Sequence, residues 1–148
     1  MFKALLQTDR AASALVLRVF LAVVFFPHGA QKVLGWFGGH GLQAAMAGMM
    51  KMHIPLSFAV LAIAAEFLGP IGLFFGFLTR VAAFAIAVEM CVAVLLVHLK
   101  FGFFMNWFGQ KAGEGIEYHL LIIGMSIALM IMGGGTWSID RSIAPGRK

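Results

Sequence analysis

Two apolar runs joined by a short turn decide the fold: residues 55–99 read PLSFAVLAIAAEFLGPIGLFFGFLTRVAAFAIAVEMCVAVLLVHL. Each run matches the length of about 20 apolar residues that a helix needs to cross a bilayer. A helix that is apolar around its whole circumference belongs in lipid or in a large core. We therefore expect two membrane-spanning helices, over 55–77 and 81–99, connected by a turn at 78–80 that carries Arg80.

Two further apolar stretches, 11–34 and 118–136, flank this hairpin. The 148-residue chain is 61% apolar and 11% charged, with a mean hydropathy of +0.95. Soluble domains are only about 45 to 50% apolar even when Gly is counted as apolar. The sequence thus predicts an all-α fold: an integral membrane antiparallel four-helix bundle that forms one domain over 1–148.

Several classes of function are excluded by the composition. Cys91 is the only cysteine, so neither an internal disulfide nor a Cys-x-x-Cys pair can form. The net charge of +5 comes from scattered basic residues and not from a stripe, which argues against nucleic-acid binding. The sequence has no P-loop and no dinucleotide fingerprint, so we expect no flavin or nucleotide bound by this chain and no enzyme that acts alone.

The loops at one end of the predicted bundle have unusual compositions. In 35–54, Leu42, Met46, Met49 and His53 recur at helical spacing, which predicts a short interfacial helix over about 42–53. Its methionines also leave open a Cu(I) site made of thioethers, although Met is a common packing residue. In the 100–117 loop, aromatic residues gather within eight positions, which suits a headgroup belt or a lid over the bundle: Phe101, Phe103, Phe104, Trp107 and Phe108.

The distribution of basic residues predicts the orientation. Six lie at the chain ends and the 78–80 turn, namely Lys3, Arg10, Arg80, Arg141, Arg147 and Lys148. Four lie in the long loops on the other side: Lys32, Lys51, Lys100 and Lys111. Since basic residues accumulate on the cytoplasmic side, we expect both termini in the cytoplasm.

Ionisable residues inside the predicted spans are the candidates for function. Each costs on the order of 2.5 to 3.5 kcal/mol in a membrane, so such side chains usually face the bundle interior and find partners. The first span carries Arg18, His28 and Lys32 within an arc of roughly 80°. The second carries Glu66 near its middle, and we expect the long Arg18 side chain to pair with it. This pair is interpreted either as catalytic or as a structural ion pair that fixes helix register.

The third and fourth spans contribute further polar groups. Glu89 and His98 are nine residues apart and should point to opposite faces, which leaves Glu89 for a backbone hydrogen bond or a subunit interface of a homo-oligomer. The predicted polar pocket consists of seven residues: Arg18, His28, Lys32, Glu66, His98, Glu117 and His119. Its histidines are either interfacial residues with snorkelling tips or contacts for a ligand, a proton, a quinone, a metal or haem. No span has a His-x-x-x-His pair, and no metal site is predicted.

The order of these residues along the chain resembles the DoxX family of small four-helix bacterial membrane proteins. The resemblance rests on Arg18, Gly29-x-x-Lys32, Glu66-x-x-Gly69 with Gly72, Gly76, Thr79 and Arg80, and then Asn106 and Glu117. It implies a bacterial inner-membrane protein with both ends in the cytoplasm and a polar interior formed by Arg18, Lys32, Glu66 and Glu117. Some relatives resemble the membrane subunit of a thiosulfate:quinone oxidoreductase, and others act in resistance to oxidative and thiol stress.

The sequence and this resemblance together lead us to expect a subunit of a bacterial redox system that works with soluble or peripheral redox proteins. Electrons would pass from small sulfur compounds or a partner protein to quinone, whose carbonyls Lys32, His28 or His119 would bind; no covalently attached cofactor is expected. One alternative is a carrier or binding protein for a small ligand or metal ion at the same pocket. Another is a structural scaffold that holds soluble partners at the membrane.

Overall fold

The computed structural model describes residues 6–8 and 11–144, and over these residues it contains helices and no strand. Four helical segments run antiparallel: α2 (Ala12–Val33), α4 (Leu56–Phe75), α5 (Thr79–Ala93) and α6 (Glu117–Met132). A π-helical turn, η1 (Val94–His98), and a 3₁₀ turn, η2 (Leu99–Phe101), extend α5. The predicted all-α bundle is confirmed.

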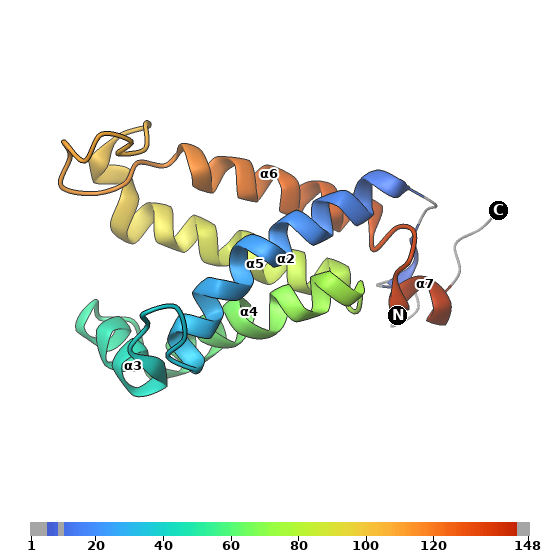
Figure 1. The fold of residues 1–148 in the computed structure, drawn as a ribbon, viewed down its shortest axis with the longest axis horizontal. Helices are drawn as coiled ribbons and strands as arrows, with labels where there is room; N and C mark the ends of the chain where they lie inside the picture. The colour runs from blue at the N-terminus through green and yellow to red at the C-terminus, as the bar shows by residue number, and fades with distance from the viewer. Residues whose placement is uncertain (1–5, 9–10, 145–148) are drawn as a thin grey trace.

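The loops gather at the two ends of the bundle (Figure 1). Helix α3 (Gly41–Lys51) and the 102–116 loop lie at one end, here called the α3 end. The α4–α5 turn and the short helix α7 (Ile139–Ile143) lie at the other, the α7 end. Four residues that enter the orientation count fall outside the described residues: Lys3, Arg10, Arg147 and Lys148.

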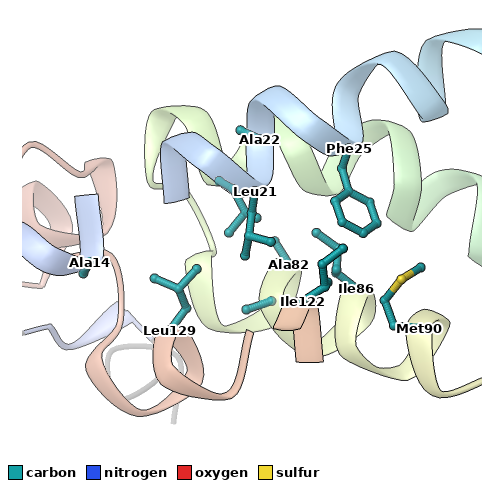
Figure 2. Close-up of a cluster of buried hydrophobic side chains, with 11 residues drawn as sticks. Ala14, Leu21, Ala22, Phe25, Ala82, Ile86, Met90, Ile122 and Leu129 are labelled. Carbon is teal, nitrogen blue, oxygen red and sulfur yellow. The ribbon is translucent and has the colours of Figure 1, made fainter. Parts of the chain in front are cut away.

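The outer surface of the bundle is apolar, as a membrane protein requires. Phe20, Leu61, Leu95, Leu121 and Ile131 are each at least 63% exposed. Large exposed apolar areas are rare on soluble monomers. The interior contains a cluster that all four long helical segments share, with Leu21, Phe25, Leu73, Ile86, Met90, Ile122 and Leu129 among its members (Figure 2). The chain is therefore built to expose apolar side chains to lipid and to pack a second set inside.

Helix α6 is shorter than expected. Three helical stretches, α2, α4 and residues 79–101, are long and apolar enough to cross a membrane, whereas α6 has 16 residues and spans about 24 Å. The sequence predicted helix to residue 136, but α6 ends at Met132 because Gly133 adopts a left-handed φ of 76°. Thr8 fixes this end, since its hydroxyl donates to the Met132 carbonyl and accepts the Gly135 N–H.

The α4–α5 turn is tighter than the sequence indicated. Gly76 ends α4 in the left-handed region at φ 64°, and the Phe77 N–H bonds to the Gly72 carbonyl at 2.8 Å, as in a Schellman motif. Helix α5 then begins at Thr79 instead of the expected Val81. The cause lies far along the chain: the Asp140 carboxylate accepts the N–H groups of residues 78 and 79 at 2.7 and 2.8 Å. Asp140, a residue of α7, thus caps the N-terminal end of α5.

Replacing Asp140 with Asn should destabilise the α7 end. The amide offers one acceptor oxygen where the carboxylate offers two, so one buried N–H at the start of α5 loses its partner. We expect the free energy of unfolding, measured by titrating detergent-solubilised protein with SDS, to fall by about 1 to 2 kcal/mol. Ser142→Ala, at an exposed position of α7, is the control and should change the free energy of unfolding by less than about 0.5 kcal/mol. Equal effects of the two substitutions would contradict the capping role.

Candidate functional site

An ion pair joins α2 to α4 toward the α3 end. The Nζ atom of Lys32 contacts the Oε2 atom of Glu66, whose side chain is 7% exposed against 32% for Lys32. One turn before Lys32, Gly29 lets the two helices approach, since a Cβ at this position would lie 2.3 Å from the backbone oxygen of Glu66. The Gly29-x-x-Lys32 spacing therefore has a physical meaning: the glycine brings the backbones together where the lysine pairs with the carboxylate.

The expected pairing of Arg18 with Glu66 is wrong. Arg18 is fully buried, and its guanidinium donates to four backbone carbonyls at the α7 end, those of Leu73, Phe74, Thr136 and Trp137, at 2.9 to 3.1 Å. Glu66 instead lies at the level of Gly29, eleven residues further along α2, a rise of about 16 Å. Even a long arginine side chain cannot cover that depth in addition to the distance between the helices.

A second carboxyl group lies beside this ion pair. Glu89 of α5 interacts electrostatically with both Glu66 and Lys32. Its Oε2 atom is shielded from solvent and has no hydrogen-bond partner within the described part of the chain. Within this chain the Glu89 carboxyl group interacts with its own bundle, and its role at a subunit interface stays a prediction. We call Lys32, Glu66 and Glu89 the lysine–carboxylate cluster.

Lys32 also lines a cavity of about 300 Å³ between the end of α2 and α3. The other lining residues are Gln31, His40, the glycines at 38, 39 and 41, and Ala44 and Ala45. The residues around this cavity include a lysine and a histidine but no carboxylate. Its volume is at the lower limit for sites that bind small molecules. Lys32 thus connects a space open to the α3 end with the buried carboxyl groups.

His98 and His119 form a separate pair between the end of η1 and the start of α6. Their ring centroids are 4.1 Å apart at an interplanar angle of 42°. His98 Nδ1 donates to the Glu114 carbonyl at 2.9 Å, whereas His119 Nδ1 is buried without a hydrogen-bond partner in the described ranges. The π-helical turn that carries His98 is a feature often found at functional sites.

Glu117 organises the 102–116 loop. Its Oε1 atom accepts the Met105 N–H at 2.7 Å and the indole N–H of Trp107 at 3.2 Å. Four aromatic side chains of this loop are more than half exposed: Phe103, Phe104, Trp107 and Phe108. This exposure favours the headgroup belt over a lid that covers the polar groups. Glu117 therefore acts at the loop and not in a shared pocket.

The structure thus separates the seven predicted pocket residues. It brings together Lys32 and Glu66, and separately His98 and His119. Arg18 lies at the α7 end, Glu117 in the loop, and His28 is an exposed residue whose ring meets Phe25 edge-on at 6.5 Å. The predicted pocket left out Glu89, a member of the cluster whose charge within a span was the signal. It also left out Gln31 and His40, which line the adjoining cavity. Within residues 6–8 and 11–144, no three His, Cys, Asp or Glu side chains are placed to hold a metal ion.

A family model, DoxX, matches residues 13–99, a range that begins in the first turn of α2 and includes α3, α4, α5 and η1. The match contains all three members of the lysine–carboxylate cluster and ends before Glu117 and His119. No solved structure matches the chain.

Two relatives match nearly the whole chain. The chain is 27% identical over 134 residues to a Bacillus subtilis (strain 168) protein named "Putative oxidoreductase CatD", which covers 90% of this chain and 89% of the relative. This chain is also 31% identical over 132 residues to "Inner membrane protein YqjF" of Escherichia coli (strain K12). The alignment covers 86% of this chain and 88% of the relative. Both matches extend well beyond the range of the family model.

Proposed function

The chain belongs to the DoxX family, and from this premise we propose that it is the membrane subunit of a bacterial redox system that passes electrons to quinone. The electron donor would be a small sulfur compound or a soluble redox protein. A relative named as an oxidoreductase supports the redox role, and a relative named as an inner membrane protein supports the location. The excess of basic residues at the chain ends supports cytoplasmic termini.

The observation that carries this proposal is the position of Lys32 between a cavity and a buried carboxylate. The Lys32 ammonium lines the space of about 300 Å³ and contacts Glu66 at its inner side. A quinone headgroup offers carbonyl oxygens as hydrogen-bond acceptors, and an ammonium group can donate to one of them. His40, which lines the same cavity, offers a ring nitrogen for a second contact. His28 is exposed on α2 and His119 is paired with His98, so neither lies as favourably as Lys32.

The chemistry of quinone reduction fits this arrangement. Reduction to quinol takes up two electrons and two protons, and negative charge develops on the quinone oxygens as the electrons arrive. A fixed cation beside one oxygen stabilises that charge, and the effect is large in a site of low dielectric constant. The redox partner supplies the electrons. The lysine–carboxylate cluster supplies groups that can hold and transfer protons.

Replacing Lys32 with Met tests the proposed site. We expect purified wild-type protein to bind a short-chain ubiquinone, measured by quenching of its tryptophan fluorescence, and Lys32→Met to bind it about ten to a hundred times more weakly. This range corresponds to the loss of one hydrogen bond from a charged donor, about 1.5 to 3 kcal/mol. Lys51→Met is the matched control, since Lys51 is an exposed lysine of α3 that does not line the cavity.

Two results would overturn the quinone assignment. One is the absence of quinone binding by the wild type; the other is equal binding by both variants. A second function is favoured by the carboxylate-free lining of the cavity, which suits a small anion. If thiosulfate binds in a Lys32-dependent manner and ubiquinone does not, the protein is a small-anion carrier or receptor instead.

A further inference from the structure

Glu89 is a partly exposed residue whose carboxyl group has one buried oxygen that the fold does not satisfy. It is placed on α5 within the bundle, and its Oε2 atom has neither solvent contact nor a hydrogen-bond partner among the described residues. Buried polar atoms are nearly always paired, and exceptions call for an explanation such as an unseen proton or ligand. The ion pair between Lys32 and Glu66 lies beside it and does not provide that partner.

The charges around Glu89 do not balance if both carboxyl groups are ionised. From α2 comes Lys32, which contacts Glu66 directly, and from α4 comes Glu66 itself. The titratable residues of α6 are Glu117, Tyr118 and His119, all in its first turn, and His119 is paired with His98. One positive charge therefore faces two carboxyl groups in the interior of a membrane protein, where an uncompensated charge is costly. A proton on one carboxyl group removes the excess charge.

We propose that Glu89 holds a proton and exchanges it, through Glu66 and Lys32, with water at the α3 end of the bundle. The route consists of two contacts of Lys32 and the electrostatic interaction between Glu66 and Glu89. Lys32 meets the open cavity on one side and Glu66 on the other, and Glu66 lies within electrostatic range of Glu89. Glu89 is the carboxyl group best suited to hold the proton, because Glu66 already has the ammonium group as its partner.

The use of this proton in quinone reduction rests on the proposed function, and Glu89 would be the proton source for the proposed quinone site. When the redox partner delivers electrons to the bound quinone, the Lys32 ammonium transfers a proton to a quinone oxygen. The Glu89 carboxyl group then transfers its proton through Glu66 to the Lys32 amine and becomes a carboxylate. Water at the α3 end restores that proton, and a second round supplies the second proton of the quinol.

Infrared spectroscopy of the ligand-free protein in lipid nanodiscs tests the proton on Glu89. We expect the wild type to show the C=O stretching band of a protonated carboxyl group, and Glu89→Gln to lack it. Glu114→Gln is the control and should keep the band, because Glu114 lies outside the lysine–carboxylate cluster and its Oε2 atom accepts the Asn106 N–H in the 102–116 loop. Absence of the band from the wild type, or its persistence in Glu89→Gln, would overturn the proposal.

The same band reports the exchange route. In D₂O the band should shift as the carboxyl proton is replaced, and we expect Lys32→Met to slow this shift at least tenfold. An unchanged exchange rate would exclude Lys32 from the route. If Glu89→Gln does not fold, Glu89→Asp replaces it: a band whose frequency does not respond to that change does not arise from residue 89. Because no quinone is present, failure here leaves the proposed function standing, and absence of quinone binding leaves this result standing.

Discussion

Arg18→Met should cause one of the largest losses of stability that a single substitution in this chain can produce. The guanidinium donates to four carbonyls, and two of these, from Leu73 and Phe74, belong to the last turn of α4, where the regular i to i+4 donors end and the Gly76 N–H reaches only Leu73 of the two. The other two anchor residues 136 and 137. Asp140, which caps α5, provides a compensating charge. One arginine therefore joins α2, α4 and the segment before α7.

We expect Arg18→Met to lower the free energy of unfolding by about 3 to 5 kcal/mol, as when one partner of a buried charged network is removed. Arg18→Lys should recover only part of this, because an ammonium group has three donors and lacks the planar fork. The measurement is SDS-induced unfolding of the protein in detergent micelles. Arg141→Met is the control: it removes a cation from the same end of the bundle, but the Arg141 side chain has no hydrogen bond in the described structure. Comparable losses in both variants would mean that charge, and not these four hydrogen bonds, is what matters.

The role of Arg18 shows where the sequence stopped being informative. Its position in an apolar span predicted burial, and burial is what the structure shows. Its partners could not be predicted, because they are backbone carbonyls, which every residue has. Nor did the sequence reveal how far α4 is displaced along α2, and this displacement decides that Glu66 meets Lys32 and not Arg18.

Hydrophobic patterning was sufficient for the bundle itself. Each long apolar run became a helix, and the helical spacing of methionines in the 35–54 loop predicted α3, which begins at Gly41 and ends at Lys51. Helix ends were less predictable where distant residues determine them. Asp140 extends α5 by two residues at its start, and the glycines after Met132 shorten α6.

The sequence predicted which residues face the bundle interior better than it predicted which of them meet. The cost of charges in a membrane identified Lys32 and Glu66 as inward-facing residues, and the same argument applied to Glu89. Glu89 was nevertheless left out of the predicted pocket, because only its angle to His98 was considered. The two residues have different neighbours: Glu89 faces α2 and α4, whereas His98 meets His119 of α6. A site between three helices depends on which pairs of helices touch, and periodicity within one helix does not contain that information.

Gly29→Ala should separate α2 from α4 at the site. The added Cβ would lie 2.3 Å from the backbone oxygen of Glu66 and 2.6 Å from the Cα of Phe67, and backbone atoms cannot rotate away as a side chain can. One helix must therefore move, and the contact between Lys32 and Glu66 loosens with it. We expect the free energy of unfolding to fall by about 1 to 3 kcal/mol, the usual cost of overpacking. Quinone affinity should also fall, because Lys32 loses the partner that holds it at the cavity.

Gly124→Ala makes this prediction specific, because it adds the same methyl group to a helix where nothing lies within 4 Å of the new atom. Alanine favours the helix over glycine by about 1 kcal/mol, so Gly124→Ala should be neutral or stabilising. Gly29→Ala has the same gain in helix propensity. A net loss of stability in Gly29→Ala therefore means that the steric clash costs more than this gain. Distances between spin labels on α2 and α4, measured by pulsed electron paramagnetic resonance, should increase in Gly29→Ala alone. If stability and distances respond alike in the two variants, α2 and α4 do not depend on this close approach, and Lys32 is held in place by something other than Glu66.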